Sequence, residues 1–170
     1  MKLNMKLSDL DCVMENVNLH DYLKLYKYVK DNMINPNWLG DFTKAEIKDL
    51  LKENSKIWLY YNNDITVCSM FMLPSDNKTL NKHNVYHNED IVASLGPIMV
   101  SPDYIGNKLQ MQMMEEFEEY CKNNNYKYIF TKVSNDNKYS LSNMLKLGFK
   151  VTDEYISERG KNSTLIKEVD

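Results

Sequence analysis

The chain of 170 residues is about the length of one domain and long enough to build one hydrophobic core. Hydrophobic residues make up 43% of it and charged residues 26%, a composition that excludes the disordered, collagen-like and membrane-embedded classes. The 21 basic and 24 acidic residues give a net charge of -3 without a basic block, so we expect no nucleic acid as the main partner.

The N-terminal residues and the cysteines indicate the compartment. Residues 1–10 lack the apolar core of a signal peptide, and no later run approaches the ~18 apolar residues of a membrane span, so we expect a cytoplasmic protein with no membrane partner. Cys12, Cys68 and Cys121 lack C-x-x-C spacing, and no histidine lies near them in sequence. We therefore expect free thiols in a reducing compartment and no metal site.

Apolar residues at steps of three and four predict two helices in the first third of the chain. The first covers residues 19–29, and the second follows Thr43 and includes residues 47–51. Thr43 with Glu46 three residues later has the pattern of a capping box, which marks a helix start. Residues 35–37 read Asn-Pro-Asn and separate the two helices as a loop.

Two strands follow, at residues 56–61 and 65–73. The Asn-Asn-Asp sequence at residues 62–64 tolerates left-handed backbone conformations, so these strands are expected to pair as an antiparallel hairpin. The polar stretch at residues 74–90 is expected to be a functional or a flexible loop.

Residues 91–100 are apolar on both alternating faces, which predicts a central strand buried on both sides. Gly96 and Pro97 interrupt this strand. Because proline has no N–H and glycine no side chain, pairing should weaken there and leave backbone groups for another partner.

Five further elements complete the predicted α/β domain, which covers residues 1–170 around a mixed sheet. They are a helix at 107–123, a strand at 126–133, a helix at 137–147 with Leu141, Met144 and Leu145 inward, and closing strands at 149–156 and 164–169. Gly148 is the expected C-cap residue of the second helix. The strands at 91–100 and 126–133 flank a helix, so we expect them to be parallel neighbours with a right-handed crossover.

The ten residues from Val100 to Leu109 combine a strand end, a proline-started turn and a helix beginning. The first turn of a helix offers unpaired N–H groups and the positive end of the helix dipole, so this position suits an anion such as a phosphate. Gly106 leaves room for its approach, although an isolated glycine at such a place more often only permits a tight strand-to-helix turn. A nicotinamide-binding fingerprint is excluded, because no second or third glycine follows.

At this point the sequence resembles the GNAT superfamily of N-acetyltransferases, over residues 20–169. Three local matches carry the resemblance: Val100-x-Pro102-x-Tyr104-x-Gly106 with Leu109, then Asn137-x-x-Ser140, then Lys146-Leu147-Gly148-Phe149. The resemblance implies a single-domain GNAT-like α/β fold with a bulged central strand and a β-α-β core that binds acetyl-CoA. It also implies that an acetyl group passes from acetyl-CoA to an amine.

Carried over by residue, the resemblance implies three groups of cofactor-binding positions. Backbone amides would hold the CoA pyrophosphate at Ile105, Gly106, Asn107, Lys108, Leu109 and Gln110. Backbone groups of Ile98, Met99 and Val100 would pair with the pantetheine arm. Asn137 and Ser140 would line its other side.

The chain also departs from the family pattern. Ile105, Lys108 and Gln110 replace a basic or amide residue and two small residues of the usual phosphate turn, which puts the affinity for CoA in question. Met144 stands where the family often has a tyrosine that protonates the leaving thiolate, and Tyr139 is the candidate substitute.

The residue that accepts the proton of the amine is open. The strand at 91–100 carries no carboxylate, where the family often has a base. Four candidate bases precede this strand in the sequence: His83, His87, Glu89 and Asp90. Water is a further alternative.

The predicted function is N-acetyl transfer to a small-molecule or peptide amine, by direct attack in a ternary complex. The alternative is a non-catalytic acyl-CoA-binding or protein-interaction module with the same fold. The closing strands offer an edge for pairing with a second copy, as in a homodimer.

Overall fold

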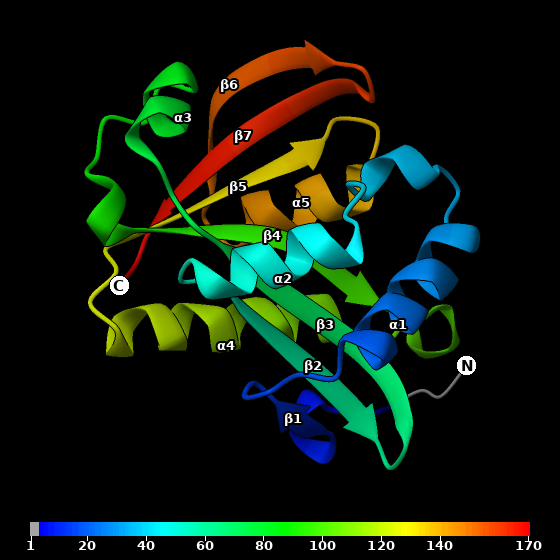
Figure 1. The fold of residues 1–170 in the computed structure, drawn as a ribbon. Helices are drawn as coiled ribbons and strands as arrows, with labels where there is room; N and C mark the ends of the chain where they lie inside the picture. The colour runs from blue at the N-terminus through cyan, green and yellow to red at the C-terminus, as the bar shows by residue number, and fades with distance from the viewer. Residues whose placement is uncertain (1–3) are drawn as a thin grey trace. The chain divides into compact units, whose positions relative to one another are not determined.

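The computed structural model describes residues 4–170 and has the expected α/β class (Figure 1). Its seven-stranded mixed sheet has the order β1-β2-β3-β4-β5-β7-β6. The strands are β1 Asp11–Val13, β2 Lys56–Asn62, β3 Ile65–Leu73, β4 Val92–Val100, β5 Tyr128–Ser134, β6 Lys150–Ser157 and β7 Gly160–Glu168. The helices are α1 Leu19–Asp31, α2 Lys44–Lys52, α3 Asn77–Lys82, α4 Leu109–Asn123 and α5 Lys138–Lys146.

The chain divides into two compact units. The first comprises residues 4–72 and 97–116, and the second comprises residues 73–96 and 117–170. Both β4 and α4 therefore contribute residues to each unit. No helix within residues 4–170 is long and apolar enough to cross a membrane.

In the first unit, β2 pairs antiparallel with β1 and β3. The predicted hairpin is confirmed, with Asn63 at a φ of 55° in its turn. The predicted helices are also confirmed, and the Thr43 side chain caps α2 by accepting the N–H of Glu46. Tyr22 of α1 meets Phe71 of β3 edge to face at 6.0 Å between ring centroids. The sequence did not reveal β1, because three residues are too few to show an alternating pattern.

In the second unit, the first half of β4 pairs parallel with β5, from Val92 opposite Tyr128 to Leu95 opposite Thr131. This confirms the predicted parallel neighbours. The pairing reaches the residue before Gly96, where the bend was predicted. β7 pairs antiparallel with both β5 and β6. The second closing strand starts at Gly160, four residues earlier than predicted, because Gly160 adopts a φ of 105° and closes a tight hairpin.

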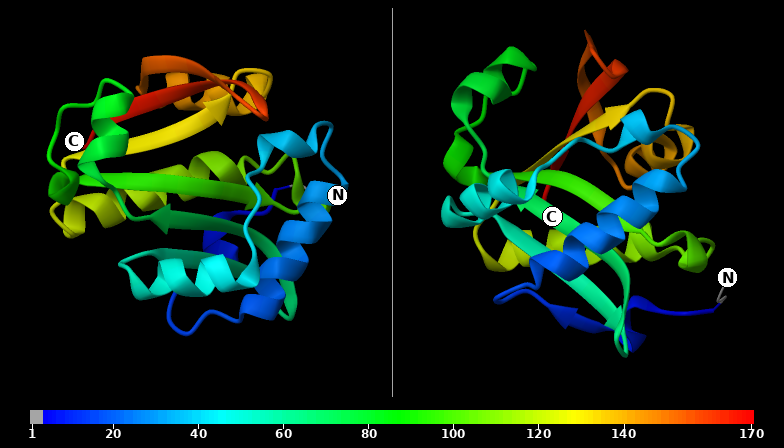
Figure 2. Two further views of the ribbon diagram at one scale, coloured as in Figure 1. Left: turned by 45° about the horizontal axis from the view of Figure 1, so that its top comes forward. Right: turned by 45° about the vertical axis from the view of Figure 1, so that its right-hand side comes forward.

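The stretch at residues 74–91, which we call the strap, is not the irregular loop that was expected. It contains α3, whose N-cap Asp76 accepts the N–H of Thr79 at 2.8 Å. Leu80 of α3 and Val85 are buried in a cluster with Val92 and Phe130. A helix of six residues is too short to show helical periodicity in sequence. In Figure 2, α3 and α5 lie on opposite faces of the ribbon formed by β5, β7 and β6.

The predicted helices at 107–123 and 137–147 are confirmed with shifted ends. α4 begins two residues late because Lys108 has a φ of 56°, which a right-handed helix excludes. α5 ends at Lys146 with Leu147 as its C-cap, and Gly148 follows with the φ of 95° that is expected of a glycine terminating a helix. Met144 is buried as predicted, but Leu145 is 49% exposed, so the inward placement of Leu145 was wrong. In so short a helix only one narrow stripe reaches the core.

Candidate functional site

The turn between β4 and α4 contains two residues with left-handed backbone conformations. The N–H of Ser101 donates to the carbonyl of Val67 at 2.7 Å and fixes the start of the turn on β3. Gly106 and Lys108 have φ angles of 99° and 56°, on either side of Asn107. Residues of alternating handedness point successive N–H groups toward one concave side, which suits an anion. The turn then runs into α4, whose N-terminal dipole end is positive.

Two amide side chains tie down the carbonyl side of this turn. The Nδ2 of Asn107, which is 7% exposed, donates to the Tyr104 carbonyl at 2.9 Å. The Nε2 of Gln112 donates to the carbonyl of Asn107 at 2.9 Å and to that of Lys108 at 3.3 Å. Because these carbonyls are satisfied by the protein itself, the turn keeps its shape without a ligand.

The N-terminal segment braces the same two side chains. The N–H of Met5 donates to the Oδ1 of Asn107 at 2.9 Å, and the N–H of Leu7 donates to the Oε1 of Gln112 at 2.8 Å. Sequence reasoning missed Gln112 and this segment, since each of these hydrogen bonds joins residues that are about a hundred positions apart in the chain. Asn107 lies in the turn and Gln112 lies five positions later, in the first part of α4. Two amide residues at this spacing form no motif that can be recognised in the sequence.

The geometry at Lys108 explains one departure from the family pattern. A lysine at a φ of 56° holds the left-handed conformation that glycine holds without strain, at a cost of roughly 1–2 kcal/mol. Its side chain is exposed and leaves the backbone shape unchanged. The missing glycine at this position therefore does not abolish the turn.

The other predicted cofactor-binding residues lie on two different elements. Met99, in the second half of β4, is 1% exposed, and its neighbours Ile98 and Val100 are half-buried. On α5, Asn137 is the N-cap and its Oδ1 accepts the N–H of Ser140 at 3.2 Å. Asn137 thus has a structural role whether or not it touches a ligand.

The two candidate acid positions have opposite environments. Tyr139 on α5 is 65% exposed, so its hydroxyl is accessible to a ligand. Met144, at the position of the family tyrosine, is 2% exposed and belongs to the core. Of these two residues, Tyr139 is the one with a hydroxyl, so it stays the predicted acid.

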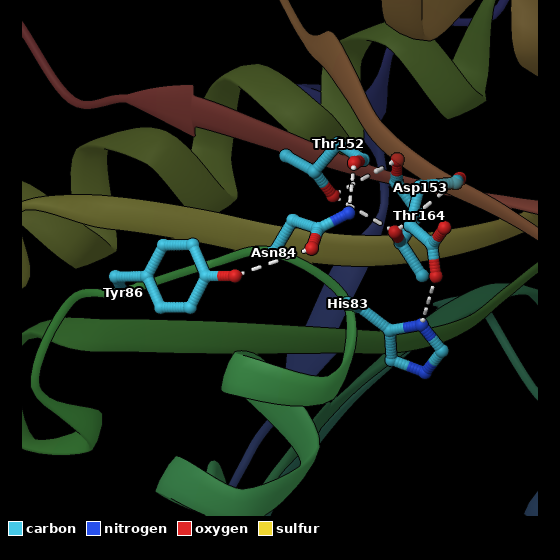
Figure 3. A network of polar contacts seen from close by, with 6 residues as sticks. All are labelled: His83, Asn84, Tyr86, Thr152, Asp153 and Thr164. Carbon is cyan, nitrogen blue, oxygen red and sulfur yellow. Dashed lines mark hydrogen bonds and ion pairs between the residues drawn. The ribbon is translucent and has the colours of Figure 1, made fainter.

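Among the candidate bases, His83 differs from the rest. It is buried, and its Nδ1 lies 3.0 Å from the Oδ2 of Asp153 (Figure 3). His87 is exposed and stacks on Tyr128 at 3.7 Å between ring centroids. Glu89 accepts the N–H of Asn77 at 2.7 Å, which gives that carboxylate a structural role in the strap.

The cysteines are free thiols with environments that suppress their reactivity. Cys68 and Cys121 are buried, and burial raises the pKa of Cys121 to about 12 and that of Cys68 further. Cys12 is exposed, yet partial burial of its thiol raises its pKa to about 11. A thiolate is the nucleophilic form of cysteine, so these thiols are poorly suited to carry an acyl group. Within residues 4–170, no group of histidine, cysteine and acidic residues is arranged to hold a metal ion.

The fold agrees with the comparisons to known proteins. The model of the acetyltransferase (GNAT) family matches residues 20–149. Sequence comparison with curated proteins finds no match.

Solved acetyltransferase structures share the fold over nearly the whole length of both chains. Ard1 from Thermoplasma volcanium is 16% identical with a TM-score of 0.71, and the match covers 94% of this chain and 98% of that one. The ribosomal-protein-S18-alanine N-acetyltransferase from Escherichia coli is 12% identical with a TM-score of 0.68, over 94% and 95% of the two chains. A GNAT family acetyltransferase from Elizabethkingia anophelis with acetyl-CoA bound is 14% identical with a TM-score of 0.65, over 94% and 98%.

The family model covers well over half of the chain, on the segment that contains the turn between β4 and α4 and the helix α5. This chain belongs to the GNAT family of acetyltransferases.

Proposed function

We propose that the chain is an N-acetyltransferase that moves the acetyl group of acetyl-CoA to a primary amine, by direct attack in a ternary complex. Acetyl-CoA is the co-substrate that family membership implies, and residues 1–170 form the catalytic domain. The acceptor is a small-molecule or peptide amine. The protein is proposed to act in the cytoplasm, where the thiol of the exposed Cys12 stays reduced.

The observation that carries this proposal is the pair of left-handed residues, Gly106 and Lys108, at the start of α4. This backbone shape is maintained by Asn107 and Gln112, side chains of the protein itself. A pre-formed turn binds the CoA diphosphate without an ordering cost, through the amides of residues 105–110. In support, the Elizabethkingia anophelis enzyme of the same fold has acetyl-CoA bound.

The remaining predicted contacts extend the cofactor site along the chain. The backbone of Ile98, Met99 and Val100 pairs with the pantetheine arm in the manner of an added strand. A main-chain N–H of this strand polarises the thioester carbonyl, where negative charge develops during attack. Asn137 and Ser140 complete the contacts to the pantetheine.

In the reaction, the lone pair of the neutral amine attacks the thioester carbon and forms the N–C bond. The C–S bond then breaks, and the CoA thiolate leaves with a proton from Tyr139 or from water. The amine proton passes to water or to His83. Holding both reactants in one complex supplies much of the acceleration, because the attack becomes effectively unimolecular.

A kinetic experiment tests this proposal against an acyl-enzyme route. Initial rates of CoA release, with acetyl-CoA and a primary amine varied together, are expected to give intersecting double-reciprocal lines. The Cys68→Ala and Cys121→Ala variants are expected to keep kcat within about twofold, because the raised pKa values of both thiols disfavour the thiolate. Circular dichroism confirms that the variants are folded.

Parallel lines together with loss of activity in a folded cysteine variant would replace direct attack by an acyl-enzyme. Binding of acetyl-CoA without turnover on a broad amine panel would instead favour a non-catalytic acyl-CoA-binding module. A homodimer through the edge strand β6 is a separate proposal, and the sedimentation velocity of the purified chain tests it.

A further inference from the structure

The chain just before β1 is anchored by contacts of its own. Leu7 begins a short 3-10 helix, Leu7–Asp9, and is 3% exposed, so its side chain belongs to the core. The N–H of Lys6 donates to the carboxylate of Asp9 at 2.9 Å, which closes the start of this helix. β1 follows and pairs with β2. The N-terminal segment, residues 5–7, is therefore held in place by contacts outside the turn between β4 and α4.

The N-terminal segment reaches this turn through two relays of hydrogen bonds, all within the first unit. In the first relay, the N–H of Met5 donates to the Oδ1 of Asn107 at 2.9 Å, and the Nδ2 of Asn107 donates to the Tyr104 carbonyl at 2.9 Å. In the second, the N–H of Leu7 donates to the Oε1 of Gln112 at 2.8 Å, and the Nε2 of Gln112 donates to the Asn107 carbonyl at 2.9 Å. In each relay one amide side chain accepts from the segment and donates to the turn.

The relays also set the direction of backbone amides in the turn. A carbonyl and the N–H of the next residue lie in one rigid peptide plane. The relays hold the carbonyls of Tyr104, Asn107 and, through a second bond from Gln112 at 3.3 Å, Lys108. The N–H groups fixed in this way are those of Ile105, Lys108 and Leu109. These are three of the six amides of the proposed diphosphate site.

The second relay also supports the unusual backbone of Lys108. A φ of 56° is unfavourable for lysine and persists only where the surrounding structure holds it. The two bonds from Gln112 clamp the peptide planes on either side of Lys108. Gln112 is itself bound by the N-terminal segment, so the conformation of the turn depends on a part of the chain far away in sequence.

We propose that the N-terminal segment is a positioning element of the cofactor site, and that its docking is coupled in free energy to the binding of acetyl-CoA. With the segment docked, the amides of the turn are ordered before the ligand arrives. With the segment detached, the ligand must order them, and its affinity falls. Because such coupling is reciprocal, bound acetyl-CoA stabilises the docked segment by the same factor. This inference rests on the proposed function of the turn as the diphosphate site.

Two substitutions of Leu7 isolate the hydrogen bond from the packing. Leu7→Pro removes the N–H that donates to Gln112, whereas Leu7→Ala keeps it, and both remove the buried leucine side chain. Proline fits this backbone, because Leu7 is the first residue of its helix and Lys6 before it is extended, with φ and ψ of -101° and 150°. By calorimetry, Leu7→Pro is expected to bind acetyl-CoA about fivefold or more weakly than Leu7→Ala. The KM for acetyl-CoA should rise by the same factor, with kcat and the KM for the amine unchanged.

Gln112→Met breaks the second relay from its other end, and it keeps the test decisive if Leu7→Pro does not fold. Methionine has a similar length but neither donates nor accepts as an amide does, so the affinity for acetyl-CoA should fall about fivefold or more. In a Gln112→Met background, the difference between Leu7→Pro and Leu7→Ala should disappear, because both changes act on one relay. The matched control is Tyr61→Phe, which removes the 2.8 Å hydrogen bond to Asp21 in the same unit and should leave the affinity unchanged. An equal loss of affinity in Gln112→Met and Tyr61→Phe would overturn the inference.

Amide hydrogen exchange of the unmodified protein measures the coupling from the side of the segment. Saturating acetyl-CoA is expected to slow exchange of the Leu7 amide by a factor similar to the loss of affinity in Leu7→Pro. Binding that is equally tight in Leu7→Pro and Leu7→Ala, with no slowing at Leu7, would overturn the inference and leave the proposed function intact. Absence of acetyl-CoA binding to the wild type would overturn the proposed diphosphate site and this inference with it.

Discussion

Replacement of Gly106 by valine is expected to lower the affinity for acetyl-CoA by about 100-fold or more, measured by calorimetry. Gly106 has a φ of 99°, which a β-branched residue adopts only with strain, so the turn should change shape. In the proposed site, the added side chain also stands where the diphosphate is expected to approach the backbone. Loss of two or three charge-assisted hydrogen bonds accounts for a change of this size.

Two variants separate this effect from general destabilisation. Gly148→Val introduces comparable strain at a φ of 95°, at the end of α5, and should lower the thermal midpoint while leaving acetyl-CoA affinity unchanged. Lys108→Gly lies in the turn itself and should raise the free energy of unfolding by about 1 kcal/mol, because glycine holds this conformation without strain. Equal losses of affinity in Gly106→Val and Gly148→Val would show that the turn has no special role.

Replacement of His83 by alanine is expected to lower the free energy of unfolding by about 3 kcal/mol, measured by urea denaturation. The variant removes a buried ring between Phe130 and Tyr155 and leaves Asp153 without its partner. Since His83 joins the strap to β6, amide hydrogen exchange of α3 should increase more than that of β5. This variant also tests whether His83 takes part in proton transfer. A loss of activity larger than the loss of folded protein would indicate such a role.

Two further variants serve as controls. Asp153→Asn keeps an oxygen that accepts from Nδ1 and is expected to cost only about 1 kcal/mol. His87→Ala removes an exposed histidine of the same strap and should cost less than 1 kcal/mol. Equal destabilisation by His83→Ala and His87→Ala would contradict the importance of the contact between His83 and Asp153.

The parts of the fold that follow local rules could be predicted from the sequence. The helix caps at Thr43 and Gly148 and the hairpin turn at Asn63 depend on residues within a few positions of one another. The parallel arrangement of β4 and β5 followed from a helix between two strand patterns. In each case the determining interaction lies within one element or between adjacent ones.

The features that were missed depend on short elements or on distant contacts. β1 and α3 are shorter than the window over which a period becomes visible. The start of α4 was placed too early because the left-handed backbone of Lys108 is enforced by the turn around it, against the preference of lysine.

The candidate site likewise contains parts that follow local rules and parts that depend on distant contacts. The turn between β4 and α4 could be located from Pro102, Gly106 and the helix after them, since these residues are consecutive, and its role as the diphosphate site stays a prediction. The pairing of His83 with Asp153 could not, because the two residues are 70 positions apart and lie on different elements.

The most direct test of the central claim is a titration of the isotopically labelled protein with acetyl-CoA, followed by amide chemical shifts. The largest shifts are expected at residues 105–110, with a second set at residues 98–100. They should saturate together and vanish in Gly106→Val. Absence of shifts at 105–110 at saturating acetyl-CoA, or saturable binding confined to other residues, would contradict the assignment of this turn as the diphosphate site.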